Sequence, residues 1–228
     1  METSQPLLVA RDLECARDGR ILFSALQLQV QQAEVISLQG ANGAGKSTLL
    51  RCIAGLYPDF EGAVTAAHFV YSGHKPGFSG LLSTSENLTY LVELDRGRAE
   101  GEGEAEAEGA KTRMPLRGPN VSPLAASVDE ALAAVGLLGY EAVRCASLSA
   151  GQLRRVGLAR LLLSVAPLWL LDEPLTALDE AGSDLLGRIL LKHLERGGGA
   201  ICATHQRLPL TDYTSVQLTP SGVVSTTV

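Results

Sequence analysis

The chain has 228 residues, of which 46% are hydrophobic and 19% charged, and this predicts a single α/β domain with a sizeable core. The formal net charge is −6, and residues 93–113 contribute −3 of it, from seven acidic and four basic side chains. The remainder is only mildly acidic, which argues against a broad basic surface for nucleic acid. The four cysteines form no CxxC pair, so we interpret them as buried and reduced rather than as a zinc site or a disulfide framework.

No stretch of the sequence has the length of a membrane span. The most apolar run, residues 161–171, has eleven residues, whereas a spanning helix needs roughly 20. Residues 1–11 lack the apolar core of a signal peptide and the composition of a transit peptide. We therefore expect any link to a membrane to run through a partner protein.

Strand and helix patterns alternate along the chain. In order, the patterns predict strands at 7–13, 21–30 and 34–38, a helix at 46–54, a strand at 64–72, helices at 85–94, 127–135 and 150–163, a strand at 168–171, a helix at 183–195 and a strand at 200–204. This alternation predicts an α/β fold with a mainly parallel sheet. Residues 95–125 are rich in Gly, Glu, Ala and Pro, which predicts a mobile, solvated acidic insertion.

A glycine-rich loop follows the third predicted strand and opens the first predicted helix. Residues 40–47 match the pattern GxxxxGK[ST]. Glycines let backbone N–H groups gather around phosphate oxygens at a helix N-terminus, where the partial positive charge favours anions. Lys46 adds a full charge near the β- and γ-phosphates of ATP, and Ser47 supplies a hydroxyl to Mg²⁺. The candidate ATP-binding residues here are Gly40, Ala41, Asn42, Gly43, Ala44, Gly45, Lys46, Ser47 and Thr48.

Two adjacent carboxylates end a predicted buried strand. Residues 168–173 read Leu-Trp-Leu-Leu-Asp-Glu, which places Asp172 at the C-terminal edge of the sheet, where α/β folds bind ligands. We expect Asp172 to hold Mg²⁺, through water, and Glu173 to polarise the water that attacks the γ-phosphate. The pattern alone is weak evidence, but its place downstream of the phosphate-binding loop makes it specific.

A third motif points to a family. Residues 148–152, Leu-Ser-Ala-Gly-Gln, resemble the LSGGQ signature of ABC ATPases, with Ala150 in place of the first glycine. In that family the signature serves the ATP bound by the opposite subunit. The resemblance thus implies a head-to-tail dimer, expected here as a homodimer, in which Ser149, Gly151 and Gln152 contact nucleotide.

Two shorter elements extend this resemblance. Leu178-Asp179 is similar to the D-loop that signals across the dimer, and His205 is similar to the switch histidine that contacts the γ-phosphate. The resemblance implies the ABC fold, a RecA-like P-loop core with an antiparallel β region and a small helical subdomain. The implied division of the single domain, residues 1–228, places the core in 1–74 and 156–228 and the subdomain, with the insertion, in 75–155.

Two positions depart from the general family pattern. The aromatic residue that stacks on adenine in many ABC ATPases is replaced here by Arg17, whose guanidinium also stacks on bases. The glutamine of the Q-loop falls on His74, twelve residues before Glu86. We expect the imidazole to hydrogen-bond a Mg²⁺-bound water, with a charge that depends on pH.

These departures, together with Gly73-His-Lys-Pro-Gly77 and the LSAGQ signature, resemble the CcmA family of ATP-binding subunits. That family serves the haem exporter of cytochrome c maturation. The resemblance implies separate multi-spanning membrane partners and a peripheral position on the ATP-containing face of a bacterial cytoplasmic membrane or a mitochondrial inner membrane. His68 and His193 show no paired ligand spacing, so we predict no direct haem site.

Two other functions stay open at this point. An ABC transport ATPase for another cargo is the second hypothesis, because cargo is selected largely by the membrane subunit and this sequence is weak evidence on it. A soluble ABC protein of translation or DNA repair is disfavoured, since such proteins usually carry tandem domains or long coiled-coil insertions, whereas this chain has one copy of each motif.

Overall fold

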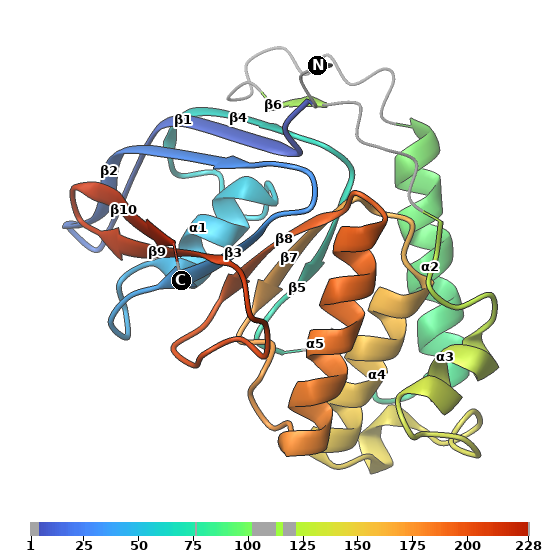
Figure 1. Cartoon of the computed structure of the whole chain (residues 1–228). Coiled ribbons are helices and arrows are strands. Elements are labelled where there is room, and N and C mark those ends of the chain that lie inside the picture. The colour runs from blue at the N-terminus through green and yellow to red at the C-terminus, as the bar shows by residue number, and fades with distance from the viewer. Residues whose placement is uncertain (1–4, 76, 102–112, 116–121, 228) are drawn as a thin grey trace.

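The computed structural model describes residues 5–75, 77–101, 113–115 and 122–227, which build two sheets flanked by helices (Figure 1). The strands are β1 (Leu8–Arg17), β2 (Arg20–Val30), β3 (Val35–Gln39), β4 (Glu61–Ala66), β5 (Phe69–Ser72), β6 (Arg113–Pro115), β7 (Leu168–Asp172), β8 (Gly199–Ala203), β9 (Thr214–Thr219) and β10 (Gly222–Thr227). The α-helices are α1 (Lys46–Ile53), α2 (Thr84–Gly101), α3 (Val128–Ala134), α4 (Ala150–Leu163) and α5 (Glu180–Glu195). A 3₁₀ turn, Cys145–Ser147, precedes α4.

The larger sheet confirms the predicted parallel core. Its order is β10-β9-β3-β8-β7-β5, with every neighbouring pair parallel except β10 and β9. The register sets Asp172 beside Ala203 and Ala203 beside Leu38, so β7, β8 and β3 end at one edge. The loops that follow these three strands therefore meet at that edge, the usual place for ligands in such sheets.

The central strands β7 and β8 are buried on both faces, which is why their sequences are continuous apolar runs. On one face, Leu168, Leu170 and Ile201 belong to a core shared with α1 and the second sheet. On the other, Trp169 and Cys202 belong to a core shared with α3, α4 and α5. Successive side chains of a strand point to opposite faces, so one short strand serves two cores.

The second sheet has the order β2-β1-β4-β6, with antiparallel pairing of β1 to β2 and to β4 and parallel pairing of β4 to β6. It curves over α1, and Figure 1 shows α1 enclosed between this sheet and the larger one. Leu49, Leu50 and Ile53 of α1 are fully buried in the core that joins the two sheets. This burial fixes α1 against β7 and β8, and hence fixes the loop that joins β3 to α1.

The predicted insertion is partly wrong. The helix expected at 85–94 continues to Gly101, and just past its predicted end Asp95 is buried and forms an ion pair with Arg160 of α4 at 3.1 Å. Farther along, Ala125 is also buried, and its N–H donates to the carbonyl of Leu162. The segment 113–115 forms β6, and the remaining part of the predicted insertion, 102–112 and 116–121, lies outside the described residues.

Other differences from the sequence prediction are local. The strand predicted at 64–72 divides into β4 and β5, which join different sheets. The hairpin of β9 and β10 was not predicted, although Val216 and Leu218 alternate with polar residues in the manner of a half-buried strand. The strands in both places are short, and a short strand shows too few alternations of apolar and polar residues to be predicted reliably from the sequence.

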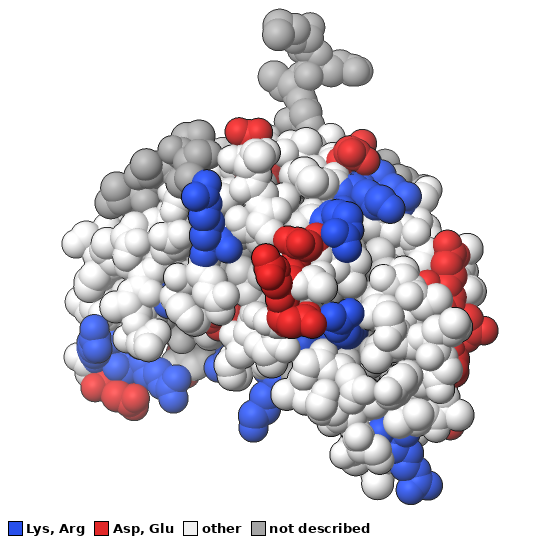
Figure 2. Space-filling model, turned by 60° about the horizontal axis from the view of Figure 1, so that its bottom comes forward, with Lys and Arg blue, Asp and Glu red and all other residues white. Residues whose placement is uncertain are grey.

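Two surface properties bear on partners. None of the described helices combines the length and apolarity needed to cross a membrane. On the face drawn in Figure 2, charged side chains of both signs stand in small groups among uncharged surface. The absence of a nucleic-acid partner stays a prediction from the charge balance.

Candidate functional site

The glycine-rich loop joins β3 to α1 and adopts a backbone that only glycine takes without strain. Gly43 and Gly45 have φ angles of 77° and 100°, in the left-handed region. A Cβ added at Gly45 would lie 3.1 Å from the Cβ of Leu22, so β2 packs directly on the loop. Gly45 is also the N-cap of α1 and supplies no side-chain cap, so the first N–H groups of α1 are left for an anion.

Lys46 is buried beneath this loop, with 8% of its surface exposed. Its Nζ donates to the carbonyl oxygens of Gly40 at 2.7 Å and Ala41 at 3.3 Å. These bonds stabilise the buried ammonium and hold it at the centre of the loop. A phosphate oxygen that enters the loop would find a positive charge already in position.

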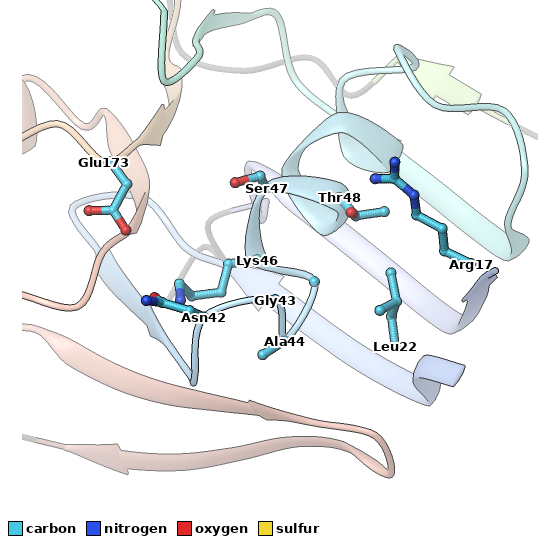
Figure 3. A pocket seen from close by; sticks show the side chains of 10 residues that line it. Arg17, Leu22, Asn42, Gly43, Ala44, Lys46, Ser47, Thr48 and Glu173 are labelled. Atoms are coloured by element: carbon cyan, nitrogen blue, oxygen red, sulfur yellow. The ribbon is translucent and has the colours of Figure 1, made fainter. Parts of the chain in front are cut away.

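A cavity of about 390 Å³ opens above the loop. Figure 3 shows Glu173 at one end and Arg17 and Leu22 at the other, with the loop residues between them. The lining residues are Arg17, Leu22, Asn42, Gly43, Ala44, Gly45, Lys46, Ser47, Thr48 and Glu173. The predicted loop residues Asn42 to Thr48 thus share one cavity with Arg17, whose guanidinium is largely exposed.

The two predicted carboxylates lie at the end of β7; Glu173 lines the cavity, and Asp172 lies behind Ser47, which also lines it. Ser47 Oγ donates to Asp172 Oδ1 at 2.9 Å. Asp172 is 1% exposed, and its Oδ2 has no hydrogen-bond partner among the described residues. A buried carboxylate oxygen without a partner, next to a serine hydroxyl, fits a hard divalent cation such as Mg²⁺, which takes oxygen ligands.

Glu173 is held by its backbone. Its φ of 51° places it in the left-handed region, and its N–H donates to the carbonyl of Ala203 at 2.8 Å. This turn directs the carboxylate into the cavity, where Oε1 lies 3.2 Å from Nδ1 of His205. The imidazole of His205 is mostly exposed. The contact between His205 and Glu173 joins the loop after β8 to the loop after β7.

Arg154 of α4 is a residue that sequence reasoning missed. It is 7% exposed; its Nε donates to the carbonyl of Thr176 at 3.1 Å and its Nη2 to that of His74 at 3.2 Å. Burial lowers the pKa of this guanidinium, and the nearby charges of Asp172 and Glu173 oppose that shift. Nothing in the sequence distinguished Arg154 from a surface residue of a helix, apart from its place two residues after the signature.

The signature residues lie outside the cavity. Ser149 caps α4 by accepting from the N–H of Gln152 at 3.2 Å, and Gln152 Oε1 accepts from the N–H of Ser149 at 2.9 Å. Gly151 approaches the chain after β7 closely, since an added Cβ would lie 3.2 Å from the carbonyl of Ala177. These residues therefore form a second, separate helix N-terminus.

Asp179 lies close to that second helix N-terminus. It caps α5 by accepting from the N–H of Gly182 at 2.9 Å, and it pairs with Arg155 of α4 at 2.9 Å. The Gly182 N–H, followed by Arg155, lowers the pKa of the Asp179 carboxyl. The ion pair ties the start of α5 to the signature helix.

His74 follows β5 and is exposed, and its carbonyl oxygen is bound by Arg154. The side chain of His74 does not line the cavity. Its predicted contact with a Mg²⁺-bound water stays a prediction.

Comparisons with known proteins agree with this geometry. Residues 23–176 match the family model described as ABC transporter. The chain is 42% identical over 214 residues to the cytochrome c biogenesis ATP-binding export protein CcmA of Methylococcus capsulatus, an alignment that covers 88% of this chain and 92% of the relative. It is 39% identical over 218 residues to the protein of the same name from Pseudomonas fluorescens, covering 90% and 92%.

Solved structures share the fold. The ATP-binding subunit of an ABC transporter superposes with a TM-score of 0.76 at 23% identity, over 97% of this chain and 90% of that one. An ATP-binding cassette solved as a dimer with ADP and Pi bound gives 0.72 at 20% identity, over 96% and 98%. The predicted α/β fold of ABC ATPases is confirmed. The chain belongs to the ATP-binding, ATP-hydrolysing subunits of ABC transporters and, among them, to the CcmA family.

Proposed function

We propose that this chain supplies the energy of ATP hydrolysis to an export complex of cytochrome c biogenesis that handles haem or its chaperone. The support for the process is the similarity to the CcmA proteins, whose names give ATP binding, export and cytochrome c biogenesis. Haem or its chaperone as the cargo is our proposal. The support for the chemistry is one observation, the meeting of Ser47, Asp172 and Glu173 at the mouth of the glycine-rich loop.

The proposed roles follow the chemistry of each group. The N–H groups of the loop and Lys46 bind the phosphates, and Arg17 lies where the base would stack. Ser47 and Asp172 hold Mg²⁺, whose oxygen ligands they supply; when bound, the ion neutralises charge on the phosphates. His74 contacts the ion's water shell only if the loop after β5 moves toward the cavity.

In the proposed hydrolysis step, the attacking water molecule lies between Glu173 and the γ-phosphate. Glu173 accepts a proton from this water as its oxygen bonds to phosphorus and the bond from phosphorus to the β,γ-bridging oxygen breaks. ADP leaves with that bridging oxygen and its electron pair. His205 holds the Glu173 carboxylate through Nδ1. Its other nitrogen would be free to contact the γ-phosphate.

The assembly we propose is a head-to-tail homodimer. Ser149, Gly151 and Gln152 form a helix N-terminus with no place in the cavity of their own chain, so they would complete the cavity of a second copy, with Asp179 beside them. The core, 1–74 and 156–228, would hold ATP, and the helical subdomain, 75–155, would carry the signature. Separate multi-spanning subunits would hold the dimer at the ATP-containing face of the membrane.

The experiment that tests the chemistry is Glu173→Gln. The amide keeps the size of the side chain but does not accept the proton, so we expect turnover to fall at least about 100-fold while ATP binding persists. With ATP and Mg²⁺ the variant should run at twice the monomer mass in size-exclusion chromatography with light scattering. Turnover at the native rate would refute the role of Glu173.

The experiment that tests the cargo is purification of the tagged chain in mild detergent from its native membrane. Recovery of small multi-spanning subunits with a cytochrome c maturation chaperone would support the proposal. Recovery of a permease for a different solute would refute the haem assignment and leave the ATPase assignment intact.

A further inference from the structure

Arg154 is a buried cation that the proposed chemistry does not use. It belongs to α4, two residues after Gln152 at the end of the signature, yet only 7% of it is exposed. A guanidinium keeps its charge even when buried, so its desolvation has to be offset by hydrogen bonds and by neighbouring negative groups. Its surroundings supply both kinds of compensation.

The hydrogen bonds of Arg154 join two loops that are distant in sequence. Nη2 binds the carbonyl of His74, in the loop after β5, at 3.2 Å. Nε binds the carbonyl of Thr176, in the loop after β7, at 3.1 Å. The planar guanidinium fixes the angle between its donors, so it sets the position of both loops relative to α4.

The negative groups near Arg154 are the two carboxylates of the site. Burial lowers the pKa of the Arg154 guanidinium, and the charges of Asp172 and Glu173 raise it, so both carboxylates lie near enough to offset part of the cost of burial. They lie on the strand β7 and its following turn, four and three residues before Thr176. The same guanidinium thus holds the backbone of this turn and faces the charges that the turn carries.

We infer that Arg154 is a positioning residue, which sets the Asp172–Glu173 edge and ties it to the His74 loop and to the signature helix. It contacts no cavity surface, so its effect falls on the arrangement of the carboxylates rather than on the binding of nucleotide. The inference rests on the proposed role of Glu173. It adds a physical link between the signature, which serves the second copy, and the carboxylates of its own chain.

The test is a set of three variants of the full chain, assayed for ATP hydrolysis with saturating Mg²⁺. Arg154→Met removes the charge and both donors but keeps the length of the side chain. We expect its kcat to fall about 10- to 100-fold, because a misplaced catalytic group costs rate at this scale, while KM changes less than about threefold. Arg154→Lys keeps the charge but loses the planar pair of donors, so we expect a smaller fall in its kcat, about two- to fivefold, at unchanged KM.

Arg188→Met is the matched control, since Arg188 is an exposed arginine on α5. It should keep native kcat and KM. A native kcat in Arg154→Met would overturn the inference, and so would a loss of kcat accompanied by an equal loss of ATP affinity. If Arg154→Met does not fold, as judged by circular dichroism, Arg154→Lys decides: a native kcat there overturns the inference, and a reduced kcat at unchanged KM supports it.

Glu173→Gln, run in the same assay, separates this inference from the proposed function. If Glu173→Gln is inactive and Arg154→Met is fully active, the positioning role of Arg154 is refuted and the catalytic role of Glu173 is not. A fully active Glu173→Gln would instead remove the catalytic assignment on which that role depends.

Discussion

Glu173 shows how backbone conformation and chemistry combine in one residue. A φ of 51° costs a residue with a Cβ on the order of 1 kcal/mol, and the hydrogen bond from its N–H to Ala203 helps to hold it there. The motif in the sequence predicted that Asp172 and Glu173 lie at the end of a strand. It could not predict this backbone turn, because the conformation is imposed by β8 and not by the local sequence.

Lys46 makes the clearest prediction at this scale. Lys46→Ala removes the buried ammonium from the centre of the loop, so we expect ATP affinity to fall about 10- to 100-fold, the worth of a charge-assisted hydrogen bond. Titration with a fluorescent ATP analogue measures it. Arg51→Gln, an exposed cation on the same helix, is the control and should bind normally. Equal affinities in the two variants would contradict the assignment of Lys46.

At the scale of elements, the sequence predicted what strong periodicity and motifs reveal. The helix at 150–163 and the strand at 168–171 agree with α4 and β7 within one residue. The extent of α2 could not be predicted, because residues 95–101 are mostly polar and contain glycine, and the ion pair of Asp95 joins α2 to a helix that is distant in sequence. Arg154 was missed for the same reason, since its partners come from loops far along the chain.

The ion pair between α2 and α4 carries a prediction about stability. Asp95→Asn keeps the size of the side chain but leaves the mostly buried guanidinium of Arg160 without its counter-charge. We expect the free energy of unfolding in urea to fall by about 2 kcal/mol. Glu93→Gln, at an exposed position of the same helix, should change it by less than about 0.5 kcal/mol. An equal effect of both substitutions would show that α2 is not anchored through Asp95.

Across the whole molecule, β7 and β8 couple two cores that would otherwise be separate. His193 of α5 contacts the N-terminal ends of both strands and is 1% exposed. Its ring stacks on Trp169 with ring centroids 3.7 Å apart. Its Nε2 lies within hydrogen-bond distance of the carbonyl oxygens of Pro167 and Gly199. Burial lowers the pKa of His193 from 6.5 to about 4. The neutral ring is therefore part of the folded structure.

This histidine makes unfolding depend on pH. The unfolded chain takes up a proton near pH 6.5, whereas the folded chain resists it until about pH 4, so stability is full above 6.5 and declines as the pH falls through this window. The loss attributable to His193 reaches about 3 kcal/mol at the acid end. Urea unfolding at several pH values should show a shallower decline in His193→Phe. The exposed His74→Gln should keep the native slope, and an unchanged slope in His193→Phe would contradict the prediction.

Trp169 is the single tryptophan of the chain, and it lies three residues before Asp172, against the ring of His193. Its intrinsic emission therefore reports from one known place. Because the indole is buried, loss of the contact between α5 and β7 would move its spectrum to longer wavelengths and change its intensity. Folding of the strand that carries the two carboxylates can thus be followed optically without attaching a label to the protein.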